Sequence, residues 1–139
     1  VNVAALVSEF RSGHAAAERI DLELPESLLA SVDSHLFSLM LRNLVDNAVK
    51  YAPETSPIKI SLMAQADHYC LAVRSLVGVI GFPDSERVFG KYYRAPLAMR
   101  RSGLGLGLYW VRGAARLQGG DALYTREHDW VVFTLCLPN

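Results

Sequence analysis

The chain has 139 residues and 51% of them are apolar, so it is long enough for one globular domain with a substantial core and too short for two. Lys and Arg balance Asp and Glu at 14 each, which gives no chain-wide reason to expect nucleic acid or an anionic membrane as a partner. No apolar run approaches the roughly 20 residues that span a bilayer. The chain begins with Val rather than Met and shows no basic leader, so we expect a fragment of a longer protein.

The first segment is predicted to form a short amphipathic helix over residues 1–11 that ends near Gly13. Its apolar residues recur at helical spacing, at Val3, Leu6, Val7 and Phe10. Residues 20–24 alternate apolar and polar side chains before Pro25 and should form a strand. Residues 28–32 are predicted to form a second short strand.

The longest predicted helix covers residues 35–52, with Asp33 or Ser34 as its cap and Pro53 helping to end it. One face of this helix is apolar and should lie in the core: Phe37, Leu41, Leu44, Val45, Ala48 and Ala52. The periodicity therefore predicts a helix packed against the rest of the domain along one side.

A polar stripe of Asn43, Asn47 and Lys50 follows the opposite face at i, i+4 and i+7. Carboxamide oxygens coordinate hard cations such as Mg²⁺, and amide and ammonium groups donate hydrogen bonds to phosphate. The stripe therefore suits an oxygen-rich anionic ligand with its metal ion. A solvated polar face is the alternative interpretation.

Two hairpins are predicted after the long helix. Residues 58–62 and 69–73 alternate and should pair, as should residues 122–126 and 130–137, which turn at His128 and Asp129. The segment between the hairpins is predicted to contain a glycine-rich loop over residues 75–83, a helical turn capped by Asp84, a cationic connector over residues 91–102 and a helix over residues 104–117, ended by Gly119 and Gly120. The sum predicts an α+β fold, a two-layer sandwich with a mixed, mostly antiparallel sheet and about three helices on one face.

Gly103, Gly105 and Gly107 stand at the entry to the last predicted helix, where unpaired backbone N–H groups attract anions. Glycine removes the Cβ atoms that would hold a phosphate away from the backbone, so the segment suits a phosphate cradle. It is neither a Walker A loop, because no Lys-Ser/Thr pair follows, nor a dinucleotide fingerprint, because Leu106 takes the place of the third glycine. The alternative is a glycine hinge with close helix packing.

Three segments together resemble the sequence boxes of sensor histidine kinases. Asn43-Leu-Val-Asp-Asn47-Ala-Val-Lys50-Tyr51 resembles the N box, Val88-Phe89-Gly-Lys-Tyr-Tyr93-Arg94 resembles the F box, and Gly103-Leu-Gly105-Leu-Gly107-Leu resembles the second glycine box. Their order and spacing agree across residues 36–137. The resemblance is to the ATP-binding catalytic domain, a member of the Bergerat-fold ATPases that also include gyrase and Hsp90-type chaperones.

This resemblance implies ATP as substrate, Mg²⁺ as its metal ion and the transfer of the γ-phosphoryl group to a histidine. Asn47, with Asn43, would hold the magnesium, and Asn43, Asn47 and Lys50 would be the catalytic residues. Asn43 stands where the hydrolytic members carry a glutamate that activates water; an amide is no base, which favours a kinase. The residues that the resemblance places at the nucleotide are Asn43, Asn47, Lys50, Tyr51, Ser75, Gly78, Gly81, Tyr93, Arg94, Gly103, Leu104, Gly105, Leu106, Gly107 and Leu108.

The first glycine box departs from the family's pattern, because Ser75 stands where the family carries an Asp that accepts a hydrogen bond from adenine. Loss of a charge-assisted hydrogen bond of about 1.5–3 kcal/mol predicts ATP binding that is weak and poorly selective for adenine. One alternative is therefore a pseudokinase module that serves protein interaction. Another is an anti-sigma-factor serine kinase, which shares the fold.

The phosphoacceptor is expected outside this chain, because none of its histidines has the acidic residue and proline that follow the family's acceptor: His14, His35, His68 and His128. Residues 1–13 would continue from an absent dimerisation domain. The implied partners are those dimerisation helices, in a homodimer of the full-length chain, and a response regulator, with no nucleic acid and no direct membrane contact. The implied location is the cytoplasmic part of a bacterial, membrane-anchored sensor.

Two further expectations concern single side chains. Phe89 would dock on the dimerisation helices or lie in the core, and Arg94, Arg100 or Arg101 would contact the triphosphate or only keep a loop soluble.

Cys70 and Cys136 each lie in an apolar strand pattern with no metal-ligand spacing, so we expect two separate buried thiols in a reducing compartment rather than a disulfide.

Overall fold

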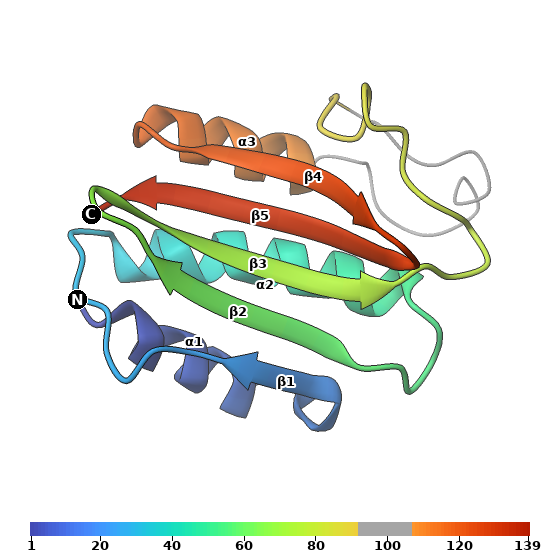
Figure 1. Ribbon diagram of the computed structural model, residues 1–139, viewed down its shortest axis with the longest axis horizontal. Coiled ribbons are helices and arrows are strands. Elements are labelled where there is room, and N and C mark those ends of the chain that lie inside the picture. The colour runs from blue at the N-terminus through green and yellow to red at the C-terminus, as the bar shows by residue number, and fades with distance from the viewer. Residues whose placement is uncertain (92–106) are drawn as a thin grey trace.

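A computed structural model describes residues 1–91 and 107–139, and it shows a two-layer α+β sandwich (Figure 1). Within those residues, three α-helices lie against one face of a five-stranded sheet. This arrangement confirms the predicted fold class. None of the described helices is both long and apolar enough to cross a bilayer.

The three α-helices end close to the predicted positions, and α1 and α2 also begin close to them: α1 (Val3–Ser12), α2 (Ser34–Tyr51) and α3 (Gly107–Leu117). A 3₁₀ turn that was not predicted, η1 (Ala17–Arg19), follows α1. The Asp33 side chain accepts a hydrogen bond from the Leu36 backbone N–H at 2.9 Å, as the predicted cap requires. After α3, Gly119 takes a positive φ of 85°, which glycine adopts without strain, and the chain turns into the next strand.

The sheet has the order β1-β2-β3-β5-β4. Its strands are β1 (Ile20–Glu23), β2 (Ile58–Ala64), β3 (His68–Leu76), β4 (Asp121–Glu127) and β5 (Trp130–Pro138). β1 runs parallel to β2 and the other neighbours are antiparallel, so both predicted hairpins are confirmed. His128 turns the second hairpin with a φ of 55°.

The predicted strand over residues 28–32 is wrong, since this segment joins no sheet. It pairs instead with the first residues of the chain, because the Val3 N–H donates to the Leu28 carbonyl at 2.7 Å and the Ala30 N–H donates to the Val1 carbonyl at 2.9 Å. Buried and exposed residues alternate in this segment, which is why its sequence resembles a strand. Its hydrogen-bond partners, however, lie in a distant part of the chain.

The core lies between the sheet and the helices. Alternate residues of β3 and β5 point into it, including Leu71, Val73, Phe133 and Leu135, each 3% exposed or less. The predicted apolar face of α2 is buried except for Ala52, which is half-buried, and Met40 joins it. The opposite face of the sheet is not covered by any described helix (Figure 1).

The cysteines differ from the prediction, because Cys70 and Cys136 are joined in a disulfide. They lie directly opposite each other on β3 and β5, and both are half-buried on the uncovered face of the sheet. The alternation of each strand places them on this face; that they meet depends on the register between two strands far apart in sequence.

Candidate functional site

A cavity of about 70 Å³ lies where the end of α2 meets β3, β5, α3 and the loop that follows β3. Several residues that the sequence assigns to the nucleotide line it together: Asn47, Tyr51, Ser75, Gly78, Gly81 and Leu108. The remaining walls are mostly apolar and come from Leu76, Ile80, Pro83, Val88, Val131 and Phe133. The cavity lining is therefore mainly apolar with a few polar groups, a composition that is common in small-molecule sites.

Ser75 is the polar group in the cavity wall that is most nearly enclosed. It is 5% exposed and is the one polar residue classed as buried within residues 1–91 and 107–139. It points to the helix-covered side of β3, in register with Ile58 and Val131 of the neighbouring strands. The Ser75 hydroxyl can either donate or accept a hydrogen bond, so it does not select between a donor and an acceptor group on a ligand.

Gly78 lets the loop after β3 pass close to the last turn of α2. A Cβ atom on Gly78 would overlap the backbone carbonyl oxygen of Tyr51, so no larger residue fits without displacing the loop. The Gly81 N–H donates to the Gly78 carbonyl at 3.1 Å, and Gly81 has a φ of 85°. The two glycines therefore set the path of the loop that closes this side of the cavity.

Asn43 faces the first turn of α3, not the cavity itself. Its side-chain Nδ2 donates to the Leu39 carbonyl at 2.9 Å, which fixes the amide, and its Oδ1 lies 2.8 Å from where a Cβ on Gly107 would stand. The polar stripe of α2 and the glycine-rich start of α3 are therefore neighbours. Lys50 lies two turns beyond Asn43 along α2, with its Nζ 5.4 Å from the centre of the Tyr51 ring.

Part of the predicted site lies outside the described residues, namely Tyr93, Arg94, Gly103, Leu104, Gly105 and Leu106, together with Arg100 and Arg101 of the predicted cationic connector. Gly107 and Leu108 are the members of the second glycine box that the structure describes. The phosphate cradle stays a prediction.

Phe89 lies in the core. Its side chain is 8% exposed, its ring meets the Phe133 ring edge-on at 6.0 Å, and the Arg112 guanidinium lies 4.2 Å from its centre. Phe89 therefore packs in the core, which was one of its two expected roles, and it also lines a groove beside α3, so its docking role stays a prediction.

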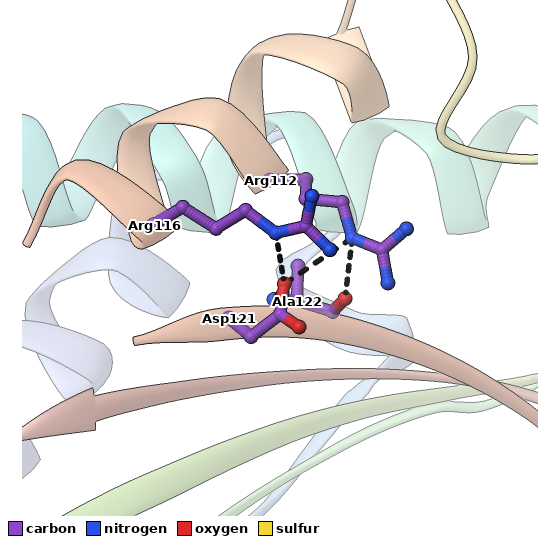
Figure 2. Close-up of polar contacts among 4 residues, drawn as sticks. All are labelled: Arg112, Arg116, Asp121 and Ala122. Carbon is purple, nitrogen blue, oxygen red and sulfur yellow. Dashed lines mark hydrogen bonds and ion pairs between the residues drawn. The ribbon is translucent and has the colours of Figure 1, made fainter. Parts of the chain in front are cut away.

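α3 is fixed to the sheet by an ion-pair cluster at its C-terminal half. Figure 2 shows Arg112 and Arg116 both directed at Asp121 on β4, with Nε to Oδ1 distances of 3.2 and 3.0 Å. Burial raises the pKa of Asp121, but hydrogen bonds from Arg116, the Ala122 N–H and Arg112 outweigh it and leave that pKa below its ordinary value. The cluster holds α3 so that its first turn stands at the cavity.

Sequence reasoning missed the apolar walls contributed by β5. Val131 and Phe133 are brought to the cavity by strand order, because β5 inserts between β3 and β4. The alternation of β5 indicated which face these residues occupy, but not that this face borders the end of α2.

Residues 32–139 match the family described as histidine kinase-, DNA gyrase B- and HSP90-like ATPase. This chain belongs to that family. The match confirms the resemblance drawn from the three sequence boxes.

Curated relatives are named as sensor kinases. Sensor-like histidine kinase SenX3 of Mycobacterium tuberculosis (strain H37Rv) is 35% identical, in an alignment that covers 99% of this chain and 36% of SenX3. Sensor histidine kinase MtrB of Mycolicibacterium paratuberculosis is 40% identical over 78% of this chain and 20% of MtrB. The chain thus spans about a third or less of the length of these relatives.

Solved structures show the same fold. The mycobacterial sensor histidine kinase MprB has a TM-score of 0.80 at 21% identity, covering 99% of this chain and 96% of that one. A nucleotide-free form of the catalytic domain of histidine kinase ThkA has a TM-score of 0.82 at 23% identity, covering 99% and 93%.

Proposed function

We propose that this chain is the ATP-binding catalytic domain of a sensor histidine kinase, which transfers the γ-phosphoryl group of ATP to a histidine on a dimerisation domain that the chain does not contain. The observation that carries the proposal is the convergence of Asn47, Ser75, Gly78 and Leu108 on one cavity, with Asn43 and Gly107 in contact beside it. Family membership and the names of the relatives support it.

The geometry suggests that different parts of the site bind the base and the phosphates of the nucleotide. The apolar interior of the cavity suits the flat face of a nucleotide base, with Tyr51 at its border and Ser75 offering one hydrogen bond. The phosphates would then extend along α2 past Asn47 towards Asn43 and the start of α3, where backbone N–H groups favour anions. Lys50 would add a positive charge to the same region.

The residues fit a magnesium ion, since carboxamide oxygens are hard ligands and Asn43 directs its oxygen towards α3. Asn47, with Asn43, would hold the ion, which when bound supplies charge neutralisation for the triphosphate. The protein's own residues position the nucleotide and exclude water from the base.

Transfer to a histidine is favoured over hydrolysis because the described lining of the cavity lacks a general base that could activate water. The cavity lining, within the described part of the chain, contains no carboxylate and no histidine. Asn43 has its amide nitrogen committed to the Leu39 carbonyl and cannot accept a proton. The nucleophile would therefore come from another domain.

A groove of about 880 Å³ beside α3 is the surface best suited to that domain. It lies between α3 and the turn at residues 85–90, and it exposes Tyr109 (47%), Trp110 (38%) and Leu117 (92%). Such a concentration of exposed apolar residues is typical of an interaction site. We assign it to the chain's own dimerisation helices; a response regulator partner, a homodimeric parent and a cytoplasmic location belong to the same proposal.

Two other functions make different predictions. A pseudokinase would give no binding heat with Mg-ATP up to millimolar nucleotide, whereas weak but saturable heat supports a kinase. An anti-sigma-factor serine kinase would produce an acid-stable phosphoserine. Incubation with the histidine-bearing hairpin of the native parent should instead give a phosphorylated product that acid destroys.

The test of the site is Asn47→Ala. Loss of the carboxamide should weaken Mg-ATP binding by about tenfold or more, because a ligand to the ion or a charged-group hydrogen bond is removed. Titration calorimetry measures the change, and Asn139→Ala at the exposed end of the chain is the matched control, with unchanged affinity.

Removal of magnesium separates the metal role of Asn47 from any other. In excess EDTA, wild type and Asn47→Ala should bind ATP with the same reduced affinity. A difference that persists without the metal would contradict Asn47 as a magnesium ligand.

A further inference from the structure

The two cysteines of the chain occupy one pair of facing positions in the sheet. Cys70 on β3 lies opposite Cys136 on β5, with 4.1 Å between their Cα atoms, and the two are joined in a disulfide. In antiparallel sheets the short Cα separation belongs to pairs that exchange no backbone hydrogen bonds, and there the side chains stand closest. The sheet therefore holds the two sulfur atoms together whether or not they are bonded.

The bond is accessible from solvent. Both cysteines are half-buried and lie on the face of the sheet that no described helix covers. A hollow of about 260 Å³ opens beside Cys136, lined also by Asp67, His68, Gly119, Gly120, Leu137 and Pro138. Because both cysteines are only half-buried, small molecules can reach this pair from the uncovered face without any unfolding.

The sheet does not need the bond in order to form. β3 and β5 pair over nine positions, from His68 with Pro138 to Leu76 with Trp130, and the opposite sides of both strands are packed in the core. Reduction would break one covalent link and leave this ladder intact. The oxidised and reduced states are therefore two forms of one fold.

We propose that Cys70 and Cys136 form a reversible redox site that exchanges with small-molecule thiols and disulfides. For reduction, a small-molecule thiolate attacks one of the two cysteine sulfurs, the bond between them breaks, and the other cysteine leaves as a thiolate that takes up a proton. A second small-molecule thiolate attacks the resulting mixed disulfide at the sulfur of the bound small molecule and releases the protein cysteine. Two small thiols become one disulfide and the protein gains two electrons and two protons; oxidation is the reverse.

The consequence is a redox-dependent stability of the catalytic domain. The cysteines are 66 residues apart, so the bond closes a long loop of the unfolded chain and disfavours unfolding. The oxidised form should melt on the order of 10 °C above the reduced form. Ser75 and Val131 lie five residues along the same strands, roughly 17 Å away, so the cavity should keep its shape in both states.

The test is a redox titration of the folded chain with mixtures of reduced and oxidised glutathione. The thiols are trapped by alkylation and counted by mass spectrometry. Because the chain has two cysteines, each molecule should take either two alkyl groups or none, and the proportion should follow the glutathione ratio without denaturant. The melting difference should vanish in the Cys70→Ala, Cys136→Ala double variant.

Three results would overturn the proposal. They are a disulfide that resists reduced glutathione until denaturant is added, two glutathione adducts with no internal bond, and equal melting of the two forms. The single variants test access to the pair, because Cys136 in Cys70→Ser and Cys70 in Cys136→Ser should both be alkylated in the folded chain without denaturant. Protection of both thiols until the chain unfolds would refute the proposal. None of these readouts involves nucleotide, so they stand apart from the kinase proposal.

Discussion

Tyr69 carries a buried hydroxyl that has no hydrogen-bond partner among the described residues. The side chain is 1% exposed and points from β3 into the core. A buried hydroxyl without a partner costs free energy, since it loses its hydrogen bonds to water and gains none. Burial also raises the pKa of Tyr69 to about 12 from its ordinary value of 10.0.

Tyr69→Phe should therefore leave the free energy of unfolding at neutral pH unchanged or raise it by about 1 kcal/mol, because the ring still fills its place. Urea unfolding measures the change. Tyr109→Phe, at a residue that is 47% exposed, is the matched control and should have no effect. A loss of stability in Tyr69→Phe would mean that the hydroxyl is bonded after all.

Tyr69→Phe should also change how the free energy of unfolding depends on pH in alkaline solution. The unfolded chain ionises this phenol near pH 10 and the folded chain only near pH 12, so the unfolded state binds fewer protons between these values. The stability contributed by the neutral phenol is complete below pH 10 and is lost as the pH rises to 12. Wild type should lose about 2 kcal/mol more than Tyr69→Phe across that window.

At the scale of the elements, local patterns predicted most of what the structure shows. The 3.6-residue repeat of α2 identified its core face, Asp33 was one of the two residues expected as its cap, and strand alternation located both hairpins. These signals are local, because each depends on residues within a few positions of one another.

The errors concern partners that are distant in sequence. Residues 28–32 have a strand-like pattern but bond to the chain's first residues, and Cys70 meets Cys136 only through the register of β3 and β5. For the candidate site, spacing on α2 singled out Asn47, and the resemblance to the kinase boxes singled out Ser75 and Gly78, all of which line the cavity. The apolar walls from Val131 and Phe133 were not, because they depend on strand order.

Gly78 gives a test of how the loop after β3 shapes the cavity. In Gly78→Ala the new methyl group would overlap the Tyr51 carbonyl oxygen, so the loop must move away from α2. Nucleotide affinity should fall by about tenfold or more, whereas the melting temperature should fall only slightly. Calorimetry with Mg-ATP and thermal melting measure the two effects.

Gly113→Ala is the matched control for Gly78→Ala. Gly113 lies within α3, and the position of a Cβ there meets no atom within 4 Å. Alanine in place of glycine should stabilise the helix by up to about 1 kcal/mol and leave nucleotide affinity unchanged. If both variants bind nucleotide like wild type, the loop does not depend on its contact with α2.

At the scale of the whole molecule, the folded unit is larger than the region that matches the family. That match begins at residue 32, whereas α1 and β1 precede it. Val3 and Val7 of α1 and Ile20 of β1 are each 1% exposed or less and belong to the same core cluster as α2. β1 also adds a parallel edge strand to β2. These elements complete the core instead of serving only as a link to a preceding domain.

Val7→Ala tests this integration of α1. If α1 is part of the cooperative core, the loss of two buried methyl groups should lower the free energy of unfolding by about 2 kcal/mol, measured at the single transition of the whole chain. Ser8→Ala, at the exposed neighbouring position, should change it by less than about 0.5 kcal/mol. Circular dichroism at 222 nm follows the helices, and fluorescence of Trp110 and Trp130 follows the distant side of the domain.

If the domain has one cooperative core, the two transitions should coincide and should shift together in Val7→Ala. A separate early loss of helix signal, with the tryptophan transition unmoved, would show that α1 is an independent appendage.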